Sequence, residues 1–198
     1  MKIIGITGGV GSGKSRVLNF METEYQAYIC QADHVAWELQ SPGTACYDRI
    51  VATFGHSIIN EDRTINRKHL GSIVFADEQK LSMLNAIMHP AVKEEIKHRI
   101  VKEKENGTTL FLLEAALLLE DGYDAICDEI WYIYAEEAVR KNRLASDRGY
   151  TEEKTDAIMK QQLTEQTFRE RCQFVIDNSN DFAHTVYQIR RRMEGKEL

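Results

Sequence analysis

The chain has 198 residues, a formal net charge of -6 at neutral pH, 43% hydrophobic residues and 28% charged residues. This composition is that of a soluble globular protein rather than a disordered or membrane one, and the acidic balance argues against broad nucleic-acid binding. The length suits a single α/β domain with a helical excursion. The first apolar run is too short for a secretory signal or a membrane span, so we expect a cytoplasmic protein with no membrane partner.

Apolar runs of strand length alternate with segments of helical periodicity along the chain. This alternation predicts βαβ units around a parallel sheet. We expect five strands, at residues 2–7, 27–32, 108–113, 129–134 and 174–177. Their nearly continuous apolar character is typical of strands that are covered on both faces.

The first predicted strand leads directly into a glycine-rich segment with the pattern G-x-x-x-x-G-K-S, followed by a predicted helix at 14–24. Glycines let backbone N–H groups wrap closely around a phosphate, and a helix N-terminus adds partial positive charge there. This context predicts a nucleotide site in which Lys14 bridges the β- and γ-phosphates and Ser15 binds Mg²⁺. A glycine-rich turn with a chance lysine is the weaker interpretation. The expected nucleotide-binding residues are Gly8, Gly9, Gly11, Ser12, Gly13, Lys14, Ser15 and Arg16.

Asp33 stands at the carboxyl end of the second predicted strand, where open α/β sheets place their ligands. A carboxylate there can accept the proton of an attacking hydroxyl or hold a magnesium-bound water. The alternative is an ordinary N-cap for the helix predicted at 34–40. The two roles can coexist.

About 75 residues separate the second and third predicted strands, far more than the ~10 to 12 that a simple crossover needs. Helical periodicity predicts helices at 44–54, 66–75, 77–88 and 90–105, with Asp77 as an N-cap and Pro90 as a first helical residue. We interpret residues 41–107 as a helical subdomain inserted into the sheet domain. His89, just before Pro90, either caps the last helix or faces a ligand.

Residues 136–171 are predicted to form a flap of two helices, 136–145 and 151–171, with many charges and few large apolar side chains. Kinases use flap arginines to neutralise the transferring phosphoryl group. Arg140 and Arg143 share one side of the first helix, and Arg148 follows on the turn, although each is equally well a surface residue. The core comprises residues 1–40, 108–135 and 172–198, and its last helix, 181–194, ends in an arginine run that we interpret as solvated.

The ordered set of these motifs resembles the dephospho-coenzyme A kinase family from Ile4 to about Asn178. Three positions depart from the family pattern: Gln31 stands where its first Asp is usual, Arg16 where Thr often follows the loop serine, and Glu114 where D-x-P is frequent. Arg148 is shifted by one position from the usual lid arginine. The segments that carry the resemblance are GITGGVGSGKS at 5–15 with its preceding strand, Asp33 with Val35 and Ala36, Pro42-Gly43, Phe54-Gly55, Asn66-Arg67, His89-Pro90, LLLE at 117–120, Arg143, Gly149, Thr151, Gln162 and VIDN at 175–178.

The resemblance implies an α/β P-loop kinase fold with a five-stranded parallel sheet, an inserted helical subdomain that holds coenzyme A, and a helical lid. It implies ATP- and Mg²⁺-dependent phosphorylation of the ribose 3′-hydroxyl of dephospho-coenzyme A, the final step of coenzyme A biosynthesis. A monomer is favoured, with this small molecule as its partner. The residues implied are Lys14, Asp33 and Arg143 for catalysis, Asp33, Arg67, His89 and Glu120 for the substrate, and Ser15 and Asp33 for the metal.

Two alternatives remain open. Another small-molecule P-loop kinase, such as a nucleoside monophosphate kinase, would share the loop and Asp33 but not the motifs of the insertion. A nucleotide-dependent regulatory switch would be expected to carry the guanine-reading motif N-K-x-D, and the nearest segment, NSND at 178–181, lacks its lysine.

Overall fold

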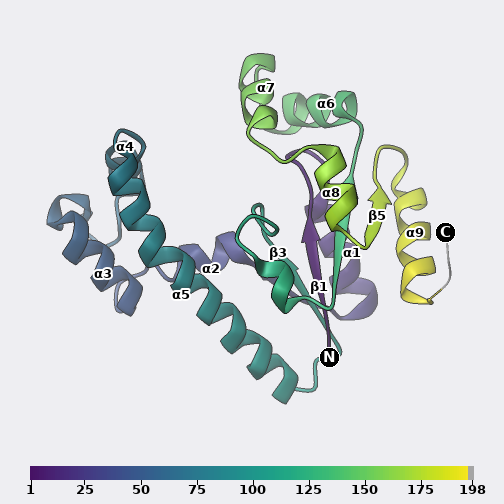
Figure 1. Ribbon diagram of the computed structural model, residues 1–198, viewed down its shortest axis with the longest axis horizontal. Coiled ribbons are helices and arrows are strands. Elements are labelled where there is room, and N and C mark those ends of the chain that lie inside the picture. The colour runs from purple at the N-terminus through teal and green to yellow at the C-terminus, as the bar shows by residue number, and fades with distance from the viewer. Residues whose placement is uncertain (196–198) are drawn as a thin grey trace. The chain divides into compact units, whose positions relative to one another are not determined.

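The computed structural model describes residues 1–195, and its internal contacts divide the chain into two compact units. The first unit combines Met1–Ile29 with Asn106–Leu198, and the second is Cys30–Glu105. Figure 1 labels the α-helices of both units and the strands β1, β3 and β5. None of the helices within the described range is both long and apolar enough to span a membrane.

The strands form one five-stranded sheet in the order β2-β3-β1-β4-β5. All five predicted strands are therefore confirmed, and those at 2–7, 129–134 and 174–177 have the predicted bounds. The strands are β1 (Lys2–Thr7), β2 (Tyr28–Gln31), β3 (Leu110–Glu114), β4 (Glu129–Tyr134) and β5 (Phe174–Asp177).

The central strand β1 positions the glycine-rich loop. It pairs in parallel with β3 on one side and with β4 on the other, and β4 pairs in parallel with β5. β1 is thus the middle strand, and open parallel sheets place their ligands beyond the carboxyl ends of such strands. The loop begins there, at Gly8.

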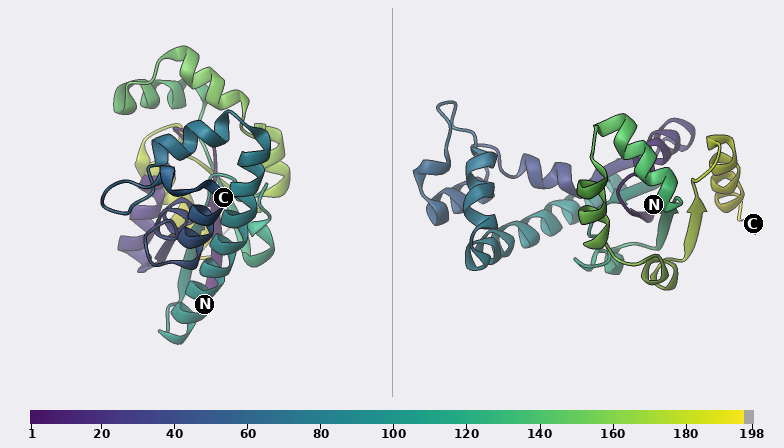
Figure 2. Two further views of the ribbon diagram at one scale, coloured as in Figure 1. Left: turned by 90° about the vertical axis from the view of Figure 1, so that its left-hand side faces the viewer. Right: turned by 90° about the horizontal axis from the view of Figure 1, so that it is seen from above.

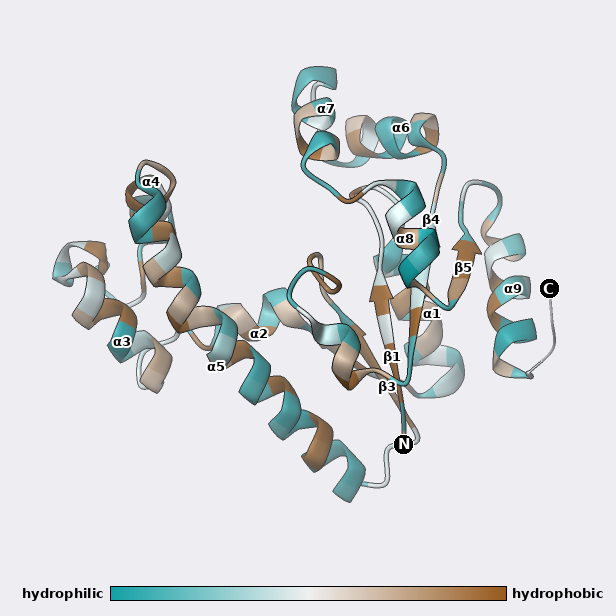
Figure 3. Ribbon diagram, in the orientation of Figure 1, coloured by the Kyte–Doolittle hydropathy of each residue, from teal (hydrophilic) through white to brown (hydrophobic). Residues whose placement is uncertain are grey.

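The core of the first unit lies between the sheet and two helices, α1 (Lys14–Tyr25) and α9 (Phe182–Met193). Trp131 and Ile4 are fully buried on this face, and each such side chain contributes roughly 1.5–3 kcal/mol by leaving water. On β4, Tyr132 also stacks on Phe168 of α8 (Glu165–Arg171), with ring centroids 4.6 Å apart. Figure 3 shows the apolar colouring concentrated on the strands, whereas α6 and α7 carry much more polar surface.

The helices α6 (Glu137–Arg148) and α7 (Glu152–Lys160) lie at the end of the sheet opposite the N-terminus (Figures 1 and 2), within residues 136–171, the segment predicted to form a lid. The single helix predicted at 151–171 is wrong, because α7 and α8 are separate. The break has a local cause: the Thr164 hydroxyl accepts a hydrogen bond from the Thr167 amide at 3.2 Å and so begins a new helix.

The second unit is helical, as predicted, and is built around the long helix α5 (Glu78–Glu105), which contacts the other three α-helices. The start of α5 has the predicted cap, because the Asp77 carboxylate accepts from the Gln79 amide at 2.9 Å. The remaining elements are α2 (Ala32–Glu38), α3 (Ala45–Phe54), the 3₁₀ turn η1 (His56–Ile58) and α4 (Arg67–Phe75).

The helix break predicted at Pro90 is wrong, because α5 continues through this residue. Proline lacks the N–H that would bond one turn back, so the helix loses one backbone hydrogen bond. Buried side chains on both sides of the proline, Ile87 before it and Val92 after it, hold the helix against its neighbours. Tertiary packing therefore outweighs the local preference.

Contacts place α2 in the second unit, whereas residues 1–40 were assigned to the core on sequence grounds. Glu38 of α2 forms an ion pair with Arg99 of α5, and Arg99 also bonds Glu95 at 2.9 Å. This pairing fastens the end of α2 to α5. The sequence offers no sign of it, because the two partners are 61 positions apart.

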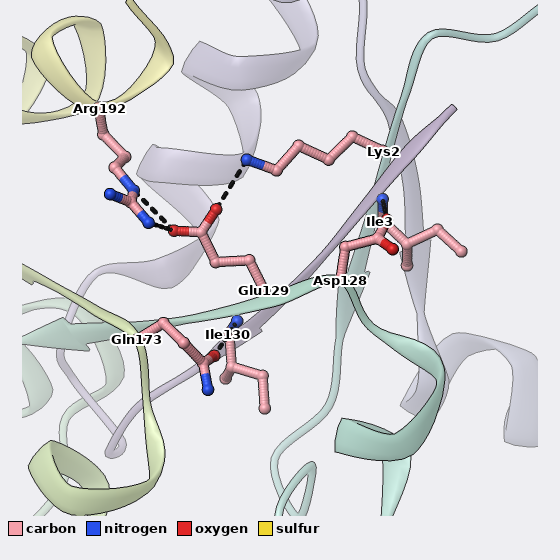
Figure 4. A network of polar contacts seen from close by, with 7 residues as sticks. All are labelled: Lys2, Ile3, Asp128, Glu129, Ile130, Gln173 and Arg192. Carbon is pink, nitrogen blue, oxygen red and sulfur yellow. Dashed lines mark hydrogen bonds and ion pairs between the residues drawn. The ribbon is translucent and has the colours of Figure 1, made fainter. Parts of the chain in front are cut away.

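A buried carboxylate joins α9 to the sheet (Figure 4). Glu129, at the start of β4, is 6% exposed and accepts from Lys2 at 2.7 Å and from Arg192 Nε at 2.6 Å. Arg190 belongs to the same arginine run, residues 190–192 in the last turn of α9, and bonds Glu24 at 2.9 Å. The interpretation of this run as a purely solvated helix end is therefore wrong. Burial alone would raise the pKa of Glu129, but the bonds from Lys2 and Arg192 hold that pKa below its usual range.

Glu129→Gln is expected to lower the free energy of unfolding by about 2 kcal/mol at pH 7, because two charge-assisted bonds weaken. The folded-state pKa is depressed, so the stabilisation is present above the ordinary glutamate pKa of about 4.3 and is lost as pH falls through the lower folded value. Urea denaturation across pH 3–7 measures this difference. Glu24→Gln, in an exposed pair, is the control, and a difference that grows on acidification would contradict the account.

Candidate active site

The glycine-rich loop joins β1 to α1, and its glycines are required by close contacts. A Cβ on Gly8 would lie 2.4 Å from the carbonyl oxygen of Ile133 in β4. Gly13 caps α1 in the left-handed region at φ 88°, which side chains disfavour. The loop therefore passes directly across the end of β4 and enters the helix through a turn that glycine alone forms easily.

Asn178, immediately after β5, fixes the loop through side-chain hydrogen bonds. Its Nδ2 donates to the Ser12 carbonyl at 2.7 Å, and its Oδ1 accepts from the Thr185 hydroxyl at 2.9 Å. A Cβ on Gly13 would lie 2.3 Å from that Nδ2. Asn178 is 2% exposed, so these bonds form away from water and fix the position of the loop relative to the sheet.

Lys14 places its ammonium group among oxygens at the carboxyl ends of β1 and β3. Its Nζ donates to the Gly8 carbonyl at 2.8 Å and lies 3.9 Å from a carboxylate oxygen of Glu114. Glu114 is the last residue of β3 and is nearly buried. Lys14 thus holds a positive charge at the predicted phosphate site, and Glu114 partly compensates that charge.

One buried hydroxyl of the loop has no hydrogen-bond partner within the described residues. Ser12 is 1% exposed, and among residues 1–195 no atom is in place to accept from or donate to its Oγ. Leaving such a group unsatisfied costs about 1–3 kcal/mol, a cost that a bound phosphate oxygen removes. Together with the N-terminus of α1, this hydroxyl suits an anion.

The geometry also bears on the metal. Ser15, in the first turn of α1, is exposed and continues the loop. Nowhere in the described chain do three or more His, Cys, Asp or Glu side chains cluster as a ready-made metal site. In P-loop proteins, however, most of the coordination of Mg²⁺ comes from nucleotide phosphates and water around one hydroxyl, and Ser15 is the residue predicted to supply that hydroxyl.

Two lid arginines reach the loop from α6. Arg143 donates through Nη2 to the Asn178 carbonyl at 2.8 Å and lies 3.4 Å from the Ser12 carbonyl. Arg140 donates through Nε to the Val10 carbonyl at 2.8 Å, and burial lowers its pKa. Arg148, at the last position of α6, is exposed.

The remaining predicted residues of the first unit lie at its surface. Arg16 places its guanidinium 4.0 Å from the ring centre of Phe182 in α9, a cation–π contact. Glu120 is exposed in the turn after β3. The contacts within this unit therefore bring Lys14, Arg143 and the glycines together.

Asp33, Arg67 and His89 belong to the second unit and are described within it. Asp33 is exposed in the first turn of α2, whose cap position is Gln31, so its interpretation as the N-cap is wrong. His89 is exposed inside the continuous α5, so it caps no helix start. Arg67 begins α4 and lies over Trp37 of α2, 5.2 Å from the ring centre.

The fold and the loop define a class of protein. The central strand of the sheet ends in this glycine-rich loop, the loop leads into α1, and two arginines of α6 contact it. This arrangement is that of the P-loop kinases. A crystal structure of a Thermus thermophilus protein superposes on this chain with a TM-score of 0.82 at 24% identity, covering 98% of this chain and 96% of that one. This likeness confirms the fold.

The family model for dephospho-CoA kinase matches residues 2–184, and the chain belongs to the dephospho-CoA kinase family. An Aquifex aeolicus relative named dephospho-CoA kinase is 39% identical over 194 residues, 98% of this chain and 97% of the relative. A Carboxydothermus hydrogenoformans relative with the same name is 35% identical over 189 residues, 96% of this chain and 91% of the relative. The predicted family is thus confirmed, and as a kinase the protein uses ATP.

Three residues were given less weight by sequence reasoning than the structure gives them: Arg140, Gln162 and Asn178. Each bonds the backbone of the loop across more than 120 positions of sequence. Gln162 and Asn178 were noted only as parts of the family pattern. A signal did exist for Arg140, because its spacing of three from Arg143 puts both side chains on one side of α6.

Asn178→Ala is expected to weaken ATP binding about tenfold and to lower stability by about 2 kcal/mol, because Ser12 and Thr185 lose a buried partner. Calorimetric titration with ATP and thermal denaturation measure the two effects. Asn180→Ala, an exposed asparagine two residues on, is the matched control. Equal ATP affinity in the two variants would show that Asn178 does not hold the loop.

Proposed function

We propose that this protein transfers the γ-phosphate of ATP to the ribose 3′-hydroxyl of dephospho-coenzyme A, giving coenzyme A and ADP. The observation that carries the proposal is the family match over residues 2–184. The phosphate-binding loop supplies independent support from geometry. The reaction belongs to the end of coenzyme A biosynthesis, and we place it in the cytoplasm with the protein acting as a monomer.

The loop is proposed to bind the triphosphate through its backbone N–H groups and the helix N-terminus. Ser12 Oγ, buried and without a protein partner in the described chain, donates to a phosphate oxygen. Lys14 moves from the Gly8 carbonyl to the β- and γ-phosphates and neutralises charge as the γ-phosphoryl group transfers. Preorganised donors of this kind account for much of the rate enhancement in phosphoryl transfer.

Asp33 is proposed as the base. The 3′-hydroxyl oxygen attacks the γ-phosphorus, its proton passes to the Asp33 carboxylate, and the bridging oxygen leaves with ADP, so atoms and charge balance. The carboxylate is exposed, in the first turn of a helix that follows β2. That position after a strand of an open sheet supports the assignment.

Arg143 and Ser15 complete the proposed chemistry. Arg143 already contacts loop carbonyls, which supports its reaching the γ-phosphate once the nucleotide binds. Mg²⁺ bound at the Ser15 hydroxyl would screen the charge of the β- and γ-phosphates, with Asp33 as its second contact through water. A lid that closes over the site excludes water and limits ATP hydrolysis.

Substrate binding is assigned to Asp33, Arg67, His89 and Glu120. Arg67 carries a positive charge over the face of Trp37, a planar arrangement suited to anionic and aromatic groups. His89 and Glu120 are exposed, which leaves them accessible to a ligand. These assignments rest on the family pattern.

Incubation of the protein with ATP, Mg²⁺ and dephospho-coenzyme A, followed by mass spectrometry, should reveal one phosphate added at the ribose. Lys14→Ala is expected to reduce this transfer by roughly 10²- to 10³-fold or more with the fold retained. Lys104→Ala, an exposed lysine at the end of α5, is the control. Full activity of the Lys14 variant, or preferential transfer to a nucleoside monophosphate, would reject the proposal.

Asp33→Asn is expected to lower kcat by roughly 10²- to 10⁴-fold while the Kd for ATP stays nearly constant, because proton transfer is lost but the loop is intact. Steady-state kinetics and ATP titration separate the two quantities. Asp48→Asn changes another exposed acid in a first helical turn and serves as the control. A loss confined to KM would assign Asp33 a positioning role instead.

A further inference from the structure

We propose that Gln162 is a positioning residue of the nucleotide site: one amide oxygen fixes both the Val10 amide of the loop and the guanidinium of Arg140. This inference deepens the proposed function and rests on one part of it, the binding of ATP by the loop. It concerns a residue of the turn between α7 and α8, outside the loop itself.

The contacts converge on a single atom. Oε1 of Gln162 accepts from the Val10 amide at 3.1 Å and from Arg140 Nη2 at 2.8 Å. An amide oxygen has two lone pairs, so both bonds are satisfied at once. The side chain is partly buried, which protects the bonds from competing water.

Arg140 closes a ring of hydrogen bonds around the same residue, Val10. Its Nε donates to the Val10 carbonyl at 2.8 Å, so Val10 is held at its N–H by Gln162 and at its oxygen by Arg140. The guanidinium lies against the loop, because a Cβ on Gly9 would be 2.3 Å from Nη2. Both side chains come from residues 136–171, the segment predicted to form a lid, and their bonds fix the backbone of the loop at Val10.

The neutrality of glutamine is central to the argument. Arginine stays protonated at physiological pH even when burial lowers its pKa, as it does for Arg140. A neutral acceptor orients this cation while leaving its full charge available to a triphosphate. A carboxylate at the same place would neutralise the arginine and add negative charge beside the phosphates.

This role differs from simple fastening of the lid to the core. Fastening requires only an acceptor, which glutamate supplies as well as glutamine does. Positioning of a cation for an anionic ligand requires a neutral acceptor. The two readings therefore predict opposite results for Gln162→Glu, a variant that keeps the size and the acceptor and so protects the fold.

The test measures the Kd for ATP by calorimetry, in the absence of any phosphate-accepting substrate, and the thermal stability of each variant. Gln162→Glu is expected to fold with near wild-type stability yet to bind ATP about tenfold more weakly at pH 7.5. Gln162→Met loses the hydrogen-bond acceptor but keeps the size of the side chain, and it is also expected to bind ATP about tenfold more weakly. Gln161→Ala, the exposed neighbouring glutamine, is the control and should match the wild type. Wild-type affinity in Gln162→Glu would overturn the proposal.

A double-mutant cycle tests the route through Arg140. If Gln162 acts by orienting Arg140, Gln162→Met combined with Arg140→Ala should bind ATP within about twofold of Arg140→Ala alone, because neighbours in one network are not additive. Fully additive losses would overturn the proposal. These titrations contain no phosphate-accepting substrate. If the dephospho-coenzyme A assignment is wrong, the failure would therefore appear only in the mass-spectrometric assay and would leave these ATP affinities unaffected.

Discussion

The site depends on the close passage of the loop after β1 across the ends of its neighbouring strands. Gly8 has no room for a side chain beside the Ile133 carbonyl, and Gly13 has none beside Asn178. The loop is therefore held by packing on both sides before any ligand arrives. This constraint positions the buried Ser12 hydroxyl, and the Lys14 ammonium is held in addition by its bond to the Gly8 carbonyl.

Side chains of the predicted lid also hold the loop in place. Arg140 and Arg143 bind carbonyl groups of the loop, so the positive charge of α6 is carried to the place where negative charge must be bound. Their bonding partners are neutral backbone or amide oxygens rather than carboxylates. Their charge thus remains available, in contrast to Arg192, whose charge is compensated by Glu129.

Sequence reasoning recovered what periodicity and local motifs encode: five strands, the loop, the helical insertion and the helix cap at Asp77. It failed where distant contacts decide. Pro90 was read as a helix start, but burial of Ile87 and Val92 keeps α5 continuous. The grouping of α2 with α5 rests on the ion pair between Glu38 and Arg99, which no local sequence pattern predicts. For the same reason the loop itself was predictable, whereas its distant partners Asn178 and Gln162 were recognisable only as parts of a family pattern.

The span between the loop and Asn178 bears on how the protein is made. Ser12 and Asn178 are 166 positions apart, and translation proceeds from the N-terminus at about 5–20 residues per second. The nucleotide cradle thus leaves the ribosome 166 residues before the asparagine that supports it. A nascent chain holds this glycine-rich segment without its β5 support until Asn178 has emerged, so a translation product truncated before Asn178 carries the motif without the finished pocket.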